Sequence, residues 1–198
     1  MAKSKNIADA STEEKIIEAA RKVFTKKGYA ATRTRDIAEE ADINLALLNY
    51  YFRSKEKLFQ LVMLEKMKQL FSVVIPIVNN EDLSLGDKLQ MLIDNYIDLL
   101  KLHPDLPIFI LSEIRANPAG FQEEVQVQKI LGQSSLVKQL EESYPAIAPV
   151  QFIVSLLGMV IFPFVAKPIL FSKHPDFNAL MDERKILVNQ WAKAMLKS

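Results

Sequence analysis

The sequence predicts an all-α protein of about nine helices, three in an N-terminal head and six in a larger body. Apolar residues recur every three or four positions, and no segment shows the sustained apolar–polar alternation of a strand. The 5 glycines and 9 prolines among 198 residues suggest helices joined by short corners. We expect two domains, a head over residues 10–70 and a body over residues 71–198.

The composition limits the protein class. Apolar residues make up 49% and charged residues 25%, which is typical of a globular chain, and without cysteine there can be no disulfide or thiolate metal site. The polar N-terminus lacks the apolar segment of a signal peptide, so we expect a cytoplasmic protein. Residues 1–70 carry 14 basic and 10 acidic residues, against 11 and 14 in residues 71–198. A basic head favours a polyanionic partner, although scattered surface charge would give the same balance.

The first helix is predicted to begin at Ser11, with Glu14 at capping-box spacing, and to end at Gly28 in a left-handed conformation. Shorter helices follow over residues 34–41 and, after the N-cap Asn44, over residues 45–51. A fourth begins after Ser54 and runs towards residues 79–80. The body helices are predicted over residues 84–102, 106–116, 119–142, 149–171 and 177–197.

The two short helices have the lengths of a helix-turn-helix, because a turn of about four residues, 41–44, joins them. A shared core would leave one face of the second short helix outward, and a major groove about 12 Å wide admits such a helix. Arg33, Arg35, Arg53 and Lys55 flank the predicted helix starts, where free amide groups attract anions. Any small helical hairpin has capped ends and a few arginines, so these features leave DNA binding and a purely structural role equally open. The predicted core residues are Ile37, Ala38, Ile43, Leu48 and Phe52.

Residues 12–64 resemble the head of the tetracycline-repressor (TetR) family of bacterial regulators. The matching residues are 16–20, Phe24, Gly28, Tyr29, Ala31, Thr32, 35–38, Ala41, 49–52, 54–56 and Leu58. The resemblance implies a DNA-binding transcriptional regulator that forms a homodimer through its last two helices. It also implies a small-molecule effector that binds in the body and releases a repressor from a palindromic operator. The rest of the chain matches the family only in helix content and length.

Carried over residue by residue, the resemblance implies a set of contacts to double-stranded DNA. Thr34 and Arg35, beside Arg33, would contact backbone or bases, and Lys55 would anchor the next helix start. Family members often have glycine where Asp42 stands, and polar or small residues where Leu45 and Leu47 stand. These leucines would contact thymine methyl groups, or one of them would pack inward. Asn44, Leu45, Ala46 and Leu47 would enter the groove, and Asn49, Tyr50 and Tyr51 would hold phosphates.

Residues 150–166 are nearly all apolar, but Gln151, Ser155 and Pro163 interrupt them, so we expect a buried helix and no contact with a membrane. One side of this helix would face the core and the other a second subunit, with an apolar seam on the last helix beside it. The alternative is that both helices complete a monomeric core. The predicted interface residues are Val154, Met159, Phe162, Leu180, Arg184, Leu187 and Trp191.

Methionine and phenylalanine side chains on the middle helices are candidates for an effector pocket, although such residues more often fill a core. His103 and His174 each precede a proline, and no metal pair, phosphate loop or nucleophile elbow is present, so we expect neither an enzyme nor a cofactor or metal. One alternative is a helical carrier of a lipid or small molecule whose head has lost its DNA-binding function. The other is an enzyme of unrecognised type. The candidate effector residues are Met63, Met67, Phe71, Phe109, Arg115 and Phe121.

Overall fold

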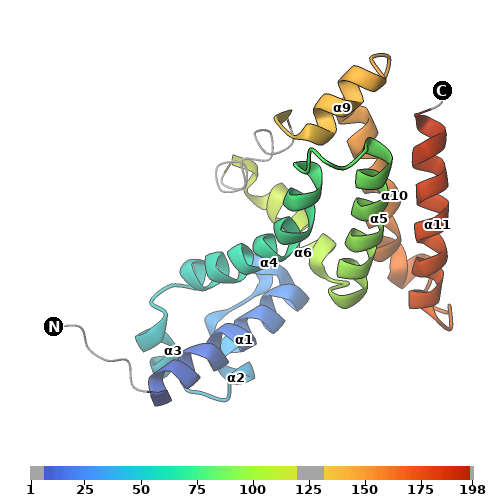
Figure 1. Ribbon diagram of the computed structural model, residues 1–198. Coiled ribbons are helices and arrows are strands. Elements are labelled where there is room, and N and C mark those ends of the chain that lie inside the picture. Colours follow the sequence, from blue (N-terminus) through green and yellow to red (C-terminus); the bar gives the residue numbers. More distant parts are fainter. Residues whose placement is uncertain (1–6, 120–131, 197–198) are drawn as a thin grey trace. The chain divides into compact units, whose positions relative to one another are not determined.

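The structure is a computed structural model that describes residues 7–119 and 132–196 (Figure 1). Within these ranges all regular structure is helical, as the sequence predicts, and the described part of the chain holds nine helices. The chain divides into two compact units, Met1–Lys68 and Gln69–Ser198.

The head unit contains α1 (Ile7–Ala31), α2 (Thr34–Glu40), α3 (Leu45–Tyr51) and the start of α4 (Lys55–Val78). One apolar side chain or more from each helix enters a common core, in which Ile16, Phe24, Ile37, Leu48 and Leu58 are at most 1% exposed. Helices as short as α2 and α3 are marginal in isolation, so burial of their inner faces against α1 and α4 is what stabilises them.

The first helix differs from the prediction at its start. It begins at Ile7, so Ser11 lies inside the helix and the predicted capping box with Glu14 does not mark its beginning. Gly28 has the predicted positive φ of 73°, with ψ at 169°, a conformation that only glycine adopts readily. The helix breaks there, and the chain makes one more turn to Ala31. The Thr32 hydroxyl donates to the Gly28 carbonyl over 2.7 Å.

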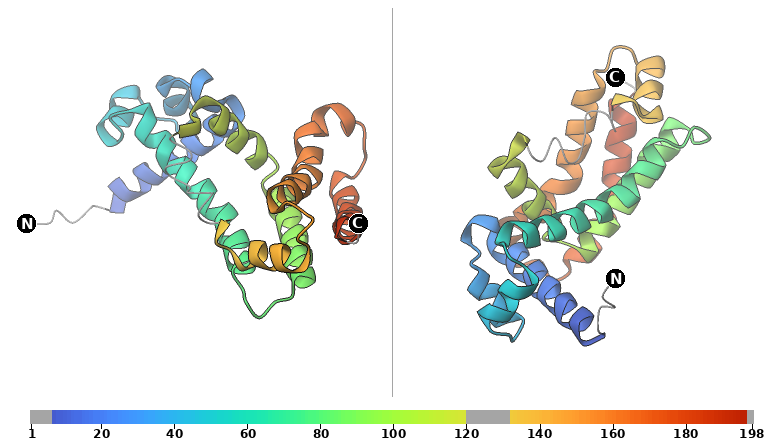
Figure 2. Two further views of the ribbon diagram at one scale, coloured as in Figure 1. Left: turned by 90° about the horizontal axis from the view of Figure 1, so that it is seen from above. Right: turned by 90° about the vertical axis from the view of Figure 1, so that its left-hand side faces the viewer.

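The body unit contains the rest of α4, α5 (Leu85–Leu102), α6 (Leu106–Ala116), α9 (Ser135–Ser143), α10 (Pro149–Leu170) and α11 (Phe177–Met195). Helices α5, α10 and α11 pack against one another, and Figure 2 shows α10 and α11 side by side in orange and red. Ile93, Ile97, Val160, Met181 and Val188 are at most 2% exposed and form part of this core.

The predicted helix over residues 119–142 is wrong in its extent. Ser134 has an extended backbone and begins α9, because its hydroxyl accepts the Val137 N–H over 3.3 Å. Ser134 is also fully buried, so this N-cap depends on packing that the local sequence does not reveal. Residues 120–131, including Phe121, lie outside the described residues.

A buried lysine joins α5 to α9. The Lys88 side chain is fully buried, and its ammonium donates to the hydroxyl of Ser135 and, over 2.7 Å, to Oε1 of Gln139. The Gln139 amide in turn donates to the Leu83 carbonyl over 3.1 Å. Burial lowers the pKa of Lys88, since desolvation disfavours the ammonium form.

Polar pairs connect α5 to α11 along an antiparallel ladder. The Asn189 amide donates to Asp94 over 3.1 Å, Lys185 donates to Asp98 over 2.6 Å, and Lys101 donates to Asp182 over 2.6 Å. The ladder borders a groove of about 410 Å³ that Gln90 and Lys193 extend. Exposed ion pairs contribute little energy, at most about 1 kcal/mol each, but their order along two helices selects a register.

Helix α10 is the one described helix that is long and apolar enough to cross a membrane, with a mean hydropathy of 2.1 over its most apolar window. Core helices of soluble proteins pass the same test. Only 28% of that window is buried in this chain, so most of the helix surface is open. One face packs in the core through Phe152, Val160 and Phe164, while Val150 and Val154 on the other are 70% and 58% exposed.

The Gly28 conformation generates a stability prediction. Gly28→Ala should destabilise the head by about 1–3 kcal/mol, because an alanine at this φ and ψ is strained. A Cβ at this position would meet no atom within 4 Å, so crowding is not the cause. Gly86→Ala, in the first turn of α5 with ordinary φ, is the control and should be neutral or slightly stabilising. Urea unfolding checks both variants, and equal stability of the two would contradict the assignment.

Candidate DNA-binding surface

The turn between α2 and α3 is fixed by its own backbone. Asp42 has a φ of 53°, the left-handed conformation expected at this place in the turn. The Ile43 N–H donates to the Ala38 carbonyl over 3.0 Å, which closes the turn. Asn44 then begins α3 as predicted, since its side chain accepts the Leu47 N–H over 2.8 Å. These bonds set the direction in which α3 leaves the turn.

Helix α3 presents a distinct outer face. Leu48 is 1% and Phe52 8% exposed, so these residues hold the helix on the head. Ala46, Asn49 and Tyr50 lie on the opposite side, and 76% of Tyr50 is exposed. Leu45 and Leu47 are half-buried and flank that outer face on either side. Neither leucine is a core residue, because Leu48 takes the inward position.

Three acidic residues of the head pair with cations on α1. Arg21 bonds to Glu18 and, over 2.7 Å, to Glu65, and Lys22 lies 3.4 Å from Glu40. These carboxylates therefore neutralise cations on α1.

Asp36, in the first turn of α2, is neutralised as well. Its carboxylate accepts the Arg33 backbone N–H over 2.9 Å and pairs with the Lys27 ammonium over 3.1 Å. The Arg33 N–H, and after it Lys27, lower the pKa of Asp36.

Three arginines beside α2 and α3 remain available. Arg33, Arg35 and Arg53 are exposed, and none makes an ion pair with another described residue. A planar guanidinium with five donors suits phosphate oxygens and base edges. The exposed face of α3 thus lies on a unit whose unpaired cations stand at the ends of the two short helices.

Lys55 is engaged inside the head. Its ammonium donates to the carbonyls of Tyr29 and Thr32, over 2.9 Å each, and lies 4.1 Å from the centre of the Tyr29 ring. Two of the three donors of this ammonium are therefore used to join the start of α4 to the end of α1. The contact of Lys55 with a phosphate stays a prediction that only the third donor can fulfil. The sequence pattern does not predict this internal role of Lys55. Nor does it predict that of Tyr29, whose ring also packs on Phe59.

The predicted DNA-contacting residues all lie on the head unit. Those that are exposed are Arg33, Arg35, Asn44, Ala46, Asn49 and Tyr50. Those that are half-buried are Thr34, Leu45, Leu47, Tyr51 and Lys55.

The predicted effector residues occupy more than one environment. Met63, Met67 and Phe109 are buried, Phe71 is half-buried and Arg115 is exposed. Met63 and Met67 belong to the head unit and the other described members to the body unit. No cavity lined by these residues is described, so their role stays a prediction.

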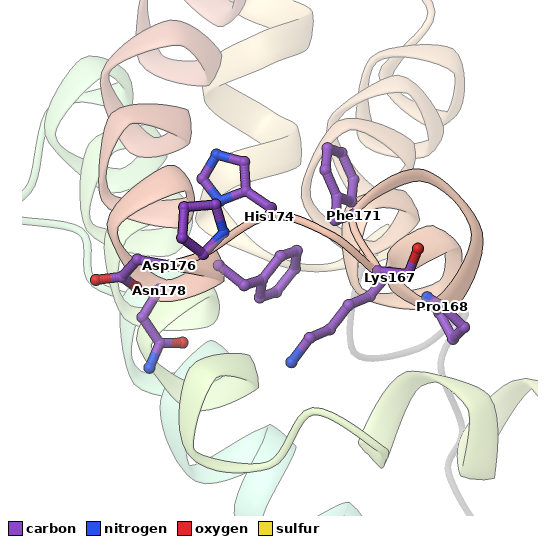
Figure 3. A pocket seen from close by; sticks show the side chains of 9 residues that line it. Lys167, Pro168, Phe171, His174, Asp176 and Asn178 are labelled. Atoms are coloured by element: carbon purple, nitrogen blue, oxygen red, sulfur yellow. The ribbon is translucent and has the colours of Figure 1, made fainter.

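A hollow of about 430 Å³ lies at the corner between α10 and α11 (Figure 3). Lys167 lines it from α10, and Phe171, His174 and Asp176 line it from the corner. Its charged groups serve the corner itself: the Lys167 ammonium lies 4.6 Å from the centre of the Phe177 ring, and Asp176 accepts the Ala179 N–H over 2.9 Å. The exposed His174 therefore has a place at a helix corner, as the sequence suggests. Among the described residues, no group of three or more potential ligands could hold a metal ion.

Residues 16–62, which hold the helix-turn-helix, match the model of the bacterial regulatory proteins of the tetR family. The chain is also 25% identical over 161 residues to the probable HTH-type transcriptional regulator YttP of Bacillus subtilis, with 78% of each chain covered. The chain carries the DNA-binding domain of the tetR family. It is a transcriptional regulator whose head is a DNA-binding helix-turn-helix.

Solved structures share the fold over nearly the whole chain. A TetR-like transcriptional regulator from Rhodococcus sp. RHA1 is 19% identical with a TM-score of 0.72, and 96% of this chain and 97% of that chain are covered. The transcriptional regulator FadR from Bacillus subtilis, in complex with stearoyl-CoA, is 20% identical with a TM-score of 0.62, and the coverage is 88% and 96%. At these identities the likeness concerns the fold.

The Lys55 contacts generate a second prediction. Lys55→Met should destabilise the head by about 1.5–3 kcal/mol, because hydrogen bonds from a charged donor to two carbonyls are lost. The exposed neighbour Lys57→Met keeps these bonds and serves as the control. Urea unfolding followed by circular dichroism measures both, and a Lys55 variant as stable as the control would refute the internal role.

Proposed function

We propose that the protein is a homodimeric repressor that binds a palindromic operator in the cytoplasm and leaves it when a small-molecule effector binds. The observation that carries this proposal is the exposed face of α3 on a head whose three unpaired arginines flank α2 and α3. Phosphate contacts of this kind supply much of the affinity of a protein for DNA, and side chains in the groove supply sequence discrimination.

The side chains of α3 indicate how the operator would be recognised. Ala46, Leu45 and Leu47 can contact thymine methyl groups in the major groove. The residues that would hold phosphates on either side are Arg33, Arg35, Asn49, Tyr50 and Tyr51. We therefore expect A·T base pairs under the middle of α3.

A second copy of the chain is the proposed occupant of the apolar faces of α10 and α11. On α10, Val154 and Phe162 are 58% and 59% exposed, and on α11, Leu187 and Trp191 are 42% and 40% exposed. These four belong to the predicted interface, while Met159, Leu180 and Arg184 are half-buried beside them. Two helices from each subunit would bury these faces in a four-helix interface. The two-fold axis would place the α3 helices about 34–36 Å apart, which requires a palindromic site.

The proposed effector is an apolar small molecule bound in the body. The similar fold of FadR holds stearoyl-CoA, so the architecture can enclose a long apolar ligand. In this chain Phe71 and Phe109, with Arg115 and Phe121, are the proposed lining, and Met63 and Met67 lie earlier on α4. Helix α4 carries residues of both units, so a ligand that favours one position of α4 would change the population competent for DNA. A regulator released in this way acts as a repressor when its operator overlaps a promoter.

Arg35→Ala should weaken operator binding about tenfold or more. Each phosphate contact contributes about 0.9 to the slope of log affinity against log salt concentration, so a dimer that loses two should show a slope smaller by about 2. Lys22→Ala is the matched control, because this cation on α1 is already paired with Glu40. Fluorescence anisotropy with duplex DNA from upstream of the chain's own gene measures both quantities. Wild-type protein with no preference for this duplex over a shuffled one would overturn the repressor proposal.

Light scattering should give the wild-type protein twice its chain mass of 22.5 kDa. Leu187→Asp should yield monomers, because it introduces a charge into the proposed interface. Ile186→Asp is the matched control: Ile186 is 63% exposed but lines the groove between α5 and α11, so the dimer should persist. A monomeric wild-type protein, or two variants that behave alike, would reject this interface.

A further inference from the structure

Helix α10 contains a buried proline whose effect on the backbone is compensated from outside the helix. Pro163 has no N–H, so the carbonyl of Met159, four residues earlier, cannot accept the usual helical hydrogen bond from it. A carbonyl left without a partner in a packed region costs free energy. Pro168 and Pro76 also lie inside helices, but both are exposed, so water can approach the helix around them.

Arg184 of α11 supplies the missing donors. Its Nε and Nη2 groups both donate to the Met159 carbonyl, over 3.2 and 3.0 Å. The other side of this contact is closed by Trp191, because the guanidinium lies 4.9 Å from the centre of the Trp191 ring. Burial lowers the pKa of Arg184, so the side chain has given up part of its hydration to reach this carbonyl.

The contact lies within the apolar faces assigned to the dimer. Phe162, beside the proline on α10, is 59% exposed, and Leu187, one turn after Arg184 on α11, is 42% exposed. A bidentate bond from α11 to the backbone of α10 therefore joins the two helices in the middle of the surface that a second copy would cover. The polar ladder to α5 lies on a different face of α11 and does not restrain α10.

We propose that Arg184 is a positioning residue for dimerisation: it replaces the hydrogen bond that Pro163 cannot give to Met159 and thereby fixes α10 and α11 as one docking surface. The proposal rests on the homodimer proposed above. It assigns Arg184 to a partner within its own chain, whereas the sequence pattern predicts a residue in direct contact with the second subunit. A direct contact with the second copy would be insensitive to the residue at position 163, whereas the internal role requires the proline.

The test is a double-mutant cycle. Pro163→Ala restores a backbone N–H that can donate to the Met159 carbonyl, so it should make Arg184 dispensable. The cycle comprises the wild type, Arg184→Met, Pro163→Ala and the double variant, with Lys193→Met as a control that removes an exposed cation from the same helix. Analytical ultracentrifugation gives the dimer dissociation constant of each, and urea unfolding gives the stability of each chain.

Arg184→Met should raise the dissociation constant about tenfold or more in the wild-type background, and Lys193→Met less than about twofold. In the Pro163→Ala background, Arg184→Met should change the dissociation constant less than about threefold. Equal losses in the two backgrounds would overturn the positioning role. Arg184→Lys, which keeps a charged donor, should fall between the wild type and Arg184→Met, and this single variant tests the role if Pro163→Ala does not fold. If the wild-type protein is monomeric, the proposed dimer is wrong. Coupling between positions 163 and 184 in urea unfolding would then still show that Arg184 replaces the hydrogen bond that Pro163 cannot give to Met159.

Discussion

The placement of α3 depends on the burial of two side chains, Leu48 and Phe52, in the core of the head. A helix of two turns has almost no stability of its own, so these residues determine that α3 exists and which way it faces. The left-handed Asp42 and the capping Asn44 set the direction in which α3 leaves the turn, but their own side chains are exposed. Because Leu48 and Phe52 are buried, the opposite face of α3 is the one that can enter a DNA groove.

The end of α1 shows how a charged side chain can be structural and still stand at a functional surface. Gly28 breaks the helix, and the carbonyls of Tyr29 and Thr32 lie just after this break. Lys55, the first residue of α4, donates to both carbonyls and so connects the start of α4 to the end of α1. The body repeats this solution in Arg184, which satisfies a carbonyl that a proline leaves open. In both units a cation donates to backbone carbonyls at a place where a helix is interrupted.

Local signals predicted the helix-turn-helix well, since Asn44 and Ser54 cap helices through contacts within three residues. The prediction failed where the decisive contact is distant or hidden. Ser11 resembles a cap, but the helix begins before it, and the buried Ser134 interrupts a segment that looks continuous.

Within the candidate site, too, only features that depend on the local sequence could be predicted. The outward position of Tyr50 follows from helical periodicity alone. The partners of Lys55 could not be found in this way, because they lie 26 and 23 residues earlier in the chain. Likewise, the carbonyl that receives Arg184 is recognisable only once two helices are placed together.

The ladder between α5 and α11 has a consequence for errors of assembly. Asp98 faces Lys185, and Lys101 faces Asp182, so the order of charge is reversed from one rung to the next. If α11 slipped by three residues along α5, Asp98 would oppose Asp182, or Lys101 would oppose Lys185, depending on the direction. Like charges would then repel each other in the misaligned state. The charge order therefore disfavours a register shift of α11 along α5 without any additional apolar contact.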